Sequence, residues 1–270
     1  MCSKKVAGVV IAACVLVSGV FAGGRRAESG GLTIKPGTLM VGMEIGYPPM
    51  EYFAEDGVTE AGFDVEMGKA LAAKLGLQVE FVDTAWDGIF AGVQTGKYDC
   101  IMSSVTITPE RSETLNFTRP YIGNAMTVVV AKGSPISFTR PEDLAGYRVT
   151  YQAETTANIY ATKIAQSGVR FEAFEYDKVM NCFDELKLGR VDLIVVDSLV
   201  AFEYLDRGPN DFQLAWQGPA DEQFGIALKK GNDALTAELS RALGELFADG
   251  TMQKISNDVF HMDLVSSVNN

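Results

Sequence analysis

The chain has 270 residues, 47% of them hydrophobic and 21% charged, and a formal net charge of −12 at pH 7. This length suits one large domain or two modest ones, and the composition is ordinary for a folded protein. The acidic balance argues against a nucleic-acid partner, because a surface that binds phosphates needs an excess of Lys and Arg.

The N-terminus has the pattern of an export signal. Two lysines precede an apolar run over residues 6–22 that ends in small residues. A basic start, a hydrophobic core and a small-residue exit predict a secretory signal peptide over 1–22 and an exported protein. A lipoprotein-like exit at Cys14 and an uncleaved anchor are alternatives, which would leave the protein lipid- or leader-anchored. The polar, glycine-rich residues 23–33 indicate a linker.

Strand and helix signals alternate after the linker. The first half is expected to contain a strand over 39–43, a helix over 65–75, a strand over 77–81, a helix over 86–94 and a strand over 97–102. The helix over 65–75 places apolar residues on one face, and Gly76 supplies its stop.

The alternation continues in the second half. The expected elements are a strand over 127–131, a short helix from 141, a strand over 148–152, a helix from 155–156, a helix over 176–188, strands over 191–196 and 224–229, and a helix over 234–248. This order predicts α/β layers with largely parallel sheets. Ligands of such sheets bind outside the carboxyl ends of the strands. Ser103, Thr155 and Asp197 each stand at such an end, which predicts a binding cleft.

Residues 103–111 carry the strongest signal for an anion site. Thr108 can cap a helix that begins at Pro109. Arg111 then falls in the first turn, where the helix dipole disfavours a cation, so its place makes sense if it faces an anion. Three hydroxyls just upstream can donate to the same anion: Ser103, Ser104 and Thr106. The alternative is a solvated cap with a surface Arg.

Few residues could support metal, redox or triad chemistry. Beyond the leader only Cys100 and Cys182 remain, and His261 is the only histidine. We expect two buried, unpaired cysteines, with a disulfide as the alternative in an exported protein. Without a Cys/His cluster or a Ser-His pair in a suitable context, we expect no catalytic residue, no metal site and no cofactor.

Eight segments in series resemble the periplasmic polar amino-acid-binding proteins of ABC importers, bacterial solute-binding protein family 3. The segments are 46–52, 62–66, 86–88, 103–111, 116–121, 155–156, 189–192 and 249–251. Each is weak alone, but the series is specific. The resemblance implies the two-lobe periplasmic-binding-protein fold (type II) with a ligand cleft between the lobes. Lobe 1 would be 34–123 plus 221–264 and lobe 2 would be 124–220.

The resemblance also implies where a ligand carboxylate would bind. The carboxylate-binding Arg of the family falls on Arg111. Its partners fall on Ser104 and Thr106, with Ser103 contributing through its carbonyl. The implied partners of the whole protein are an amino acid and the permease subunits of an ABC transporter in the membrane, with the protein itself a monomer.

The ammonium end and the second lobe follow in the same way. Thr156, beside Thr155 at a helix start in lobe 2, would donate to the same carboxylate, as expected for an anion at a helix N-terminus. Asp197 would take the α-ammonium. Because Arg111 and Thr156 lie in different lobes, the ligand would stabilise the closed state by bridging them.

Ligand specificity is expected to rest on Glu44, Tyr47 and Trp86. Tyr47 and Trp86 match the positions where family members sandwich the ligand side chain, and two aromatic faces suit a guanidinium or ammonium. Relatives that bind basic amino acids carry an acid at Glu44, as do some cystine-binding relatives. We therefore expect arginine, lysine or ornithine, ahead of cystine, glutamine or another polar amino acid.

One residue departs from the family pattern, and two other functions compete with binding. Glu154 stands where the family has a small residue, and we expect it to point to solvent. A dehydratase of the same fold would use Glu44 or Glu154 as a general acid. The full set for a zwitterion argues against an enzyme. A sensory role is the other alternative, in which the same lobes would dock on a receptor.

Overall fold

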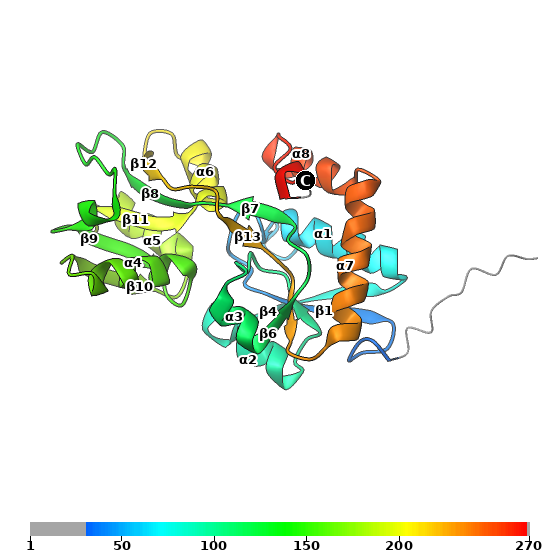
Figure 1. The fold of residues 1–270 in the computed structure, drawn as a ribbon. Helices are drawn as coiled ribbons and strands as arrows, with labels where there is room; N and C mark the ends of the chain where they lie inside the picture. The colour runs from blue at the N-terminus through cyan, green and yellow to red at the C-terminus, as the bar shows by residue number, and fades with distance from the viewer. Residues whose placement is uncertain (1–30, 269–270) are drawn as a thin grey trace, which may run out of the picture.

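The structure is a computed structural model that describes residues 31–268. The predicted signal peptide over 1–22 and residues 23–30 of the predicted linker lie outside the described residues. Figure 1 shows two α/β lobes side by side, with the chain crossing between them on the strands β7 and β13. Within residues 31–268, no helix has the length and apolar character needed to cross a membrane.

The first lobe is built on a five-stranded sheet of order β4-β1-β5-β14-β6. Its strands are β1 (Thr38–Met43), β4 (Gln78–Asp83), β5 (Cys100–Ile101), β6 (Leu115–Phe117) and β14 (Ala227–Lys229). Its helices are α1 (Phe63–Leu75), α2 (Trp86–Thr95), α3 (Pro109–Thr114), α7 (Asp233–Ala248) and α8 (Thr251–Phe260). A short hairpin of β2 (Tyr52–Phe53) and β3 (Glu60–Ala61) and the terminal turn η2 (Ser266–Val268) complete this lobe.

The second lobe has a five-stranded sheet of order β10-β9-β11-β8-β12. Its strands are β8 (Met126–Ala131), β9 (Arg148–Gln152), β10 (Glu172–Tyr176), β11 (Leu193–Asp197) and β12 (Phe212–Gln217). Its helices are η1 (Pro141–Leu144), α4 (Thr156–Gln166), α5 (Val179–Lys187) and α6 (Ser198–Arg207).

Both sheets are mixed rather than largely parallel, which corrects the expectation from the sequence. β8 pairs antiparallel with both β11 and β12, and β14 pairs antiparallel with both β5 and β6. The reason lies in the crossing. The chain enters the second lobe on β8 and leaves it on the neighbouring β12, so these two strands run in opposite directions.

The two lobes are connected by a two-stranded antiparallel ribbon. β7 (Ile122–Asn124) runs into the second lobe and β13 (Glu222–Phe224) runs back, with Asn124 opposite Glu222. The predicted single strand over 224–229 is therefore wrong. It breaks at Gly225, whose N–H donates to the Val105 carbonyl at 3.0 Å as the chain turns from the ribbon into the first sheet.

The predicted helix over 176–188 is also wrong at its start. Tyr176 ends β10, where it pairs in register with Gln152 of β9, and the helix α5 begins only at Val179. No strand is predicted at β10, because its sequence lacks a regular alternation of apolar and polar residues. In the structure its side chains are exposed or half-buried. The expected strand over 97–102 shortens to Cys100–Ile101.

Apolar residues pack against both sheets. One cluster lies in the second lobe around β9 and β11, and another packs α2 against the first sheet. The largest cluster runs through both lobes, and its members Phe63, Leu71 and Leu239 are fully buried where α1 and α7 pack over the first sheet. Cys100 and Cys182 are free thiols buried in this core, as expected from their apolar contexts.

Packing between Tyr98 and helix α2 gives a first prediction. A Cβ on Gly92 would lie 2.1 Å from the Tyr98 Oη, whereas a Cβ on Gly88 of the same helix would meet nothing within 4 Å. We expect Gly92→Ala to lower the free energy of unfolding by about 1–3 kcal/mol through overpacking. Gly88→Ala should raise it by up to about 1 kcal/mol through helix propensity.

Urea unfolding of the two variants beside the parent protein measures both effects. Because the two changes are chemically identical and lie one turn apart, equal effects would mean that Tyr98 does not pack against this face of α2.

Candidate functional site

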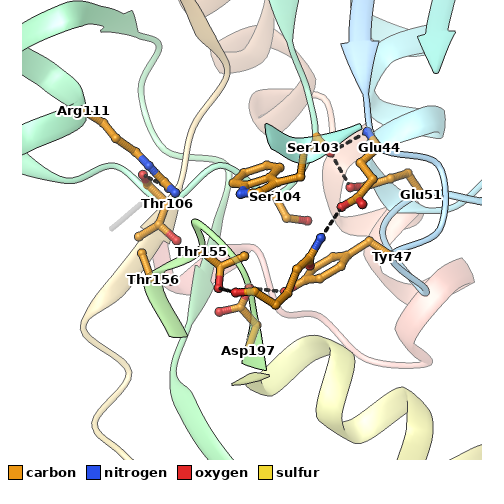
Figure 2. A pocket seen from close by; sticks show the side chains of 12 residues that line it. Glu44, Tyr47, Glu51, Ser103, Ser104, Thr106, Arg111, Thr155, Thr156 and Asp197 are labelled. Atoms are coloured by element: carbon orange, nitrogen blue, oxygen red, sulfur yellow. Dashed lines mark hydrogen bonds between the residues drawn. The ribbon is translucent and has the colours of Figure 1, made fainter. Parts of the chain in front are cut away.

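A pocket lies between the lobes, and its empty space together with the open solvent at its entrance is about 300 Å³. All ten residues predicted from the sequence line it: Glu44, Tyr47, Trp86, Ser103, Ser104, Thr106, Arg111, Thr155, Thr156 and Asp197. Figure 2 shows the side chains that it labels converging from both lobes. Glu51 and Gln152, which the sequence did not single out, also line the pocket. The pocket lies at the carboxyl ends of β1, β5, β9 and β11, where an open α/β sheet places its ligands.

Arg111 lies in the first turn of helix α3 and is held there by local contacts. Thr108 caps this helix as predicted, because its Oγ1 accepts the Arg111 N–H at 3.1 Å. The guanidinium donates to the Thr106 carbonyl at 3.0 Å and lies 5.5 Å from the centre of the Trp86 ring. Burial lowers the pKa of Arg111, and the negative charge of Asp197 acts in the opposite direction.

No carboxylate of residues 31–268 forms a salt bridge with this guanidinium. Its second amino group instead reaches the Glu154 carbonyl in the other lobe at 3.5 Å. Glu154 itself is exposed, as expected, and its backbone has a φ of 59°. An Arg fork of this kind can take both oxygens of a ligand carboxylate.

Asp197 stands at the end of β11 and the start of α6 with both oxygens hydrogen-bonded. The Tyr47 hydroxyl donates to Oδ2 at 2.6 Å and the Asn124 amide donates to Oδ1 at 2.7 Å. Burial raises the pKa of this carboxyl, and the two hydrogen bonds partly offset that effect. A carboxylate in such a place is suited to an ammonium group.

Glu44 is buried at the end of β1 with a donor from the opposite lobe. The Gln152 side-chain amide donates to its Oε2 at 2.7 Å. Glu44 is only 4% exposed, and burial raises its pKa to about 7. A buried carboxyl without a full counter-charge is costly, so a cation in the pocket would be stabilised beside it.

Three hydrogen bonds therefore cross between the lobes around the pocket. They join Tyr47 to Asp197, Gln152 to Glu44, and Arg111 to the Glu154 carbonyl. The two lobes are thus closed around the pocket. Residues more than 40 positions apart in the chain, such as Arg111 and Glu154, are in direct contact across it.

Among the predicted site residues, two have a hydrogen-bond donor that is free and two have a donor that is already used. The Ser104 hydroxyl and the Trp86 indole N–H are buried without a partner among the described residues. Buried donors usually have partners, so both are available to a ligand. In contrast, the Ser103 hydroxyl donates to Glu51 at 2.7 Å, and the Thr155 hydroxyl donates to the Gln152 carbonyl at 2.7 Å.

The first of these contacts corrects the prediction that the Ser103 hydroxyl donates to the anion, because Glu51, which is buried, accepts that hydrogen bond instead. Thr155 serves as the N-cap of α4. Gln152 could have been found from the sequence, because it ends a predicted strand as the other site residues do. Glu51 follows a proline-containing loop and carries no such signal.

Comparisons with known proteins give consistent results. The family model of the bacterial extracellular solute-binding proteins, family 3, matches residues 39–262. The chain is 34% identical over 224 residues to the ABC transporter arginine-binding protein 1 of Escherichia coli strain K12, covering 81% of this chain and 89% of that protein.

Two further similarities are to a cystine-binding protein and to a solved structure of an arginine-binding protein. The chain is 31% identical over 228 residues to the L-cystine-binding protein TcyJ of the same strain, covering 84% of each protein. A solved structure of an ancestral arginine-binding protein bound to arginine matches it with a TM-score of 0.79 and 37% identity, over 83% of this chain and 98% of that one.

The contact between Tyr47 and Asp197 yields a second prediction. Tyr47→Phe keeps the ring but removes a buried donor to a buried carboxylate, so it should lower the free energy of unfolding by about 1–3 kcal/mol. Tyr52→Phe is the matched control, because Tyr52 meets Arg207 through its ring at 5.6 Å. The control should change stability by less than about 0.5 kcal/mol. Urea unfolding at pH 7 measures both, and equal losses would contradict the role of this hydroxyl.

Proposed function

The chain belongs to the bacterial extracellular solute-binding proteins, family 3, and from this we propose that it captures a basic amino acid and delivers it to an ABC importer. The relatives named above are binding proteins for arginine and for cystine. The proposal includes export by the predicted signal peptide, a periplasmic place of action, permease subunits as membrane partners and a monomeric state. Residues 34–123 with 221–264 would form one lobe and 124–220 the other.

The observation that carries the choice of ligand is the charge pattern of the pocket. A basic amino acid has a carboxylate, an α-ammonium and a cationic side chain. The pocket presents Arg111 for the first, Asp197 for the second and Glu44 for the third. A neutral amino acid would leave the buried Glu44 with only the Gln152 hydrogen bond and the charge of Lys178 to stabilise its ionised form, which disfavours such a ligand.

The remaining contacts in this proposal follow from which donors are free. Ser104 would donate to the ligand carboxylate beside Arg111, with Thr106 and Thr156 on either side of the cleft. Ser103 would contribute its carbonyl and Thr155 would hold the start of α4. Tyr47 and Trp86 would enclose the side chain of the ligand. A ligand held by both lobes would add to the hydrogen bonds that already cross between them.

The carboxylate contact is tested first. We expect Arg111→Ala to weaken binding of L-arginine on the order of 10- to 100-fold, because it removes charge-assisted hydrogen bonds. Arg140→Ala is the control, since that side chain is 71% exposed on the second lobe. Calorimetric titration of the ligand-stripped protein measures both. Unchanged affinity in Arg111→Ala would refute the assignment of this residue.

The side-chain contact is tested by Glu44→Gln. This variant should weaken arginine, lysine and ornithine on the order of 10-fold while sparing glutamine. The pKa of Glu44 is raised by burial to about 7, and a cation prefers its ionised form. Affinity for arginine should therefore fall as pH drops below 7, by up to about 10-fold per unit, and Glu44→Gln should lose this component.

The same titrations decide between the alternatives. Tight binding of cystine or glutamine without binding of basic amino acids would keep the zwitterion contacts and discard the role of Glu44. Recovery of a chemically changed ligand after incubation would instead favour the dehydratase alternative.

A further inference from the structure

Two fully buried carboxyls lie beneath the Ser103–Ser104 turn. Glu51 is 1% exposed and Asp64, the second residue of α1, is 0% exposed. The two residues lie on neighbouring backbone segments, because the Asp64 N–H donates to the carbonyl of Met50, the residue before Glu51, at 2.9 Å. Glu51 lines the pocket, whereas Asp64 lies behind it.

Each carboxyl has one oxygen that accepts hydrogen bonds and one that does not. Glu51 Oε1 accepts from the Ser103 hydroxyl at 2.7 Å. Asp64 Oδ2 accepts from the Ser104 N–H at 2.8 Å and from the Tyr121 hydroxyl at 2.9 Å. Glu51 Oε2 and Asp64 Oδ1 are buried and accept nothing from the described residues. Two ionised carboxylates with bare oxygens in such a place would be very unfavourable.

We propose that Glu51 and Asp64 share one proton between Glu51 Oε2 and Asp64 Oδ1, and that this acid pair positions the Ser103–Ser104 turn at the ligand pocket. One proton supplies a donor for one bare oxygen and an acceptor for the other. It also removes the repulsion between two adjacent negative charges. The proton resides on Glu51, because Asp64 already accepts two hydrogen bonds that favour its ionised form.

Among residues 31–268, the titratable groups that act most strongly on the pair are Glu44, Asp197 and Tyr47 from the pocket side and Tyr121 from behind. The nearby cations Arg111 and Lys178 act on Asp197 and Glu44 respectively. Burial raises the pKa of Glu51 well above its ordinary value, and the charge of Asp64 raises it further. Burial also raises the pKa of Asp64, and its hydrogen bonds from Ser104 and Tyr121 act in the opposite direction.

The acid pair acts on the pocket through the two serines. Ser104 has a φ of 51°, a left-handed conformation that is uncommon for a residue with a side chain. Its N–H is held by Asp64, while its own hydroxyl is left without a partner at the pocket wall. Ser103 links Glu51 to the backbone of the first strand, because its Oγ accepts the Glu44 N–H at 3.0 Å.

The shared proton predicts a specific dependence of stability on pH. An unfolded chain ionises Glu51 near its ordinary pKa of about 4.3, whereas the folded protein keeps the proton. The folded state therefore binds more protons, and its stability falls as pH rises above that value. Glu51→Gln replaces the proton by a permanent N–H donor, so its melting temperature relative to wild type should rise by several degrees between pH 5 and pH 8.

Glu55→Gln is the control, because Glu55 is exposed only four residues along the chain and should keep the wild-type pH dependence. An identical pH dependence in Glu51→Gln and wild type would overturn the proposal. If Glu51→Gln does not fold, infrared spectroscopy of the Glu44→Gln variant at pH 8 decides, because Glu44, with a pKa of about 7, would add its own protonated band to the wild-type spectrum at pH 7. A protonated carboxyl band is expected, and its absence would refute the shared proton.

The positioning role is tested with L-arginine as the probe, so this part rests on the proposed function. Asp64→Asn keeps an oxygen for Ser104 and supplies an N–H to Glu51, so affinity should stay within about 3-fold of wild type. Asp64→Ala removes both and should weaken arginine on the order of 10-fold or more. Equal affinities in the two variants would refute the positioning role. If wild type does not bind arginine, the proposed function fails, and the pH experiment still decides on the acid pair.

Discussion

The cleft between the lobes buries more acid than base, and most of the local structure serves that constraint. Glu44, Glu51 and Asp197 line one pocket with a single guanidinium, that of Arg111. All three carboxyls are buried, so each needs a donor from the protein, a proton or a cation. The neutral donors Tyr47, Gln152 and Ser103 meet part of this need. A ligand with two positive groups would meet much of the rest.

The ribbon of β7 and β13 links the charged groups of the pocket to the angle between the two lobes. Asn124 on β7 donates to both Asp197 and Glu222, at 2.7 Å in each case. Its side-chain oxygen accepts from the Ser198 N–H at 3.1 Å, at the start of α6. One amide therefore connects both crossing strands to the proposed ammonium site. A change in the angle between the lobes would disturb that site through this residue.

Much of the fold is readable from local pattern. Alternation, helical spacing and capping chemistry act within a few residues, so they can be read directly from the sequence. They predict the strands β1 and β9, the helices α2 and α3, and the Thr108 cap. The ten proposed ligand contacts could be named because they stand at strand ends or in segments that resemble the family. The structure brings all ten to one pocket.

What the sequence could not supply depends on partners far away in the chain. β10 forms because its residues, ending with Tyr176 opposite Gln152, pair with β9. β8 pairs antiparallel with β12 because the strands that enter and leave the lobe lie side by side, which makes the sheet mixed. The Ser103 hydroxyl turns to Glu51, 52 residues earlier, rather than toward an anion. The sequence by itself determined which elements form and which residues stand at their ends. Only the tertiary structure decided which of those polar atoms are already hydrogen-bonded and which stay free, since that depends on which distant groups are buried together.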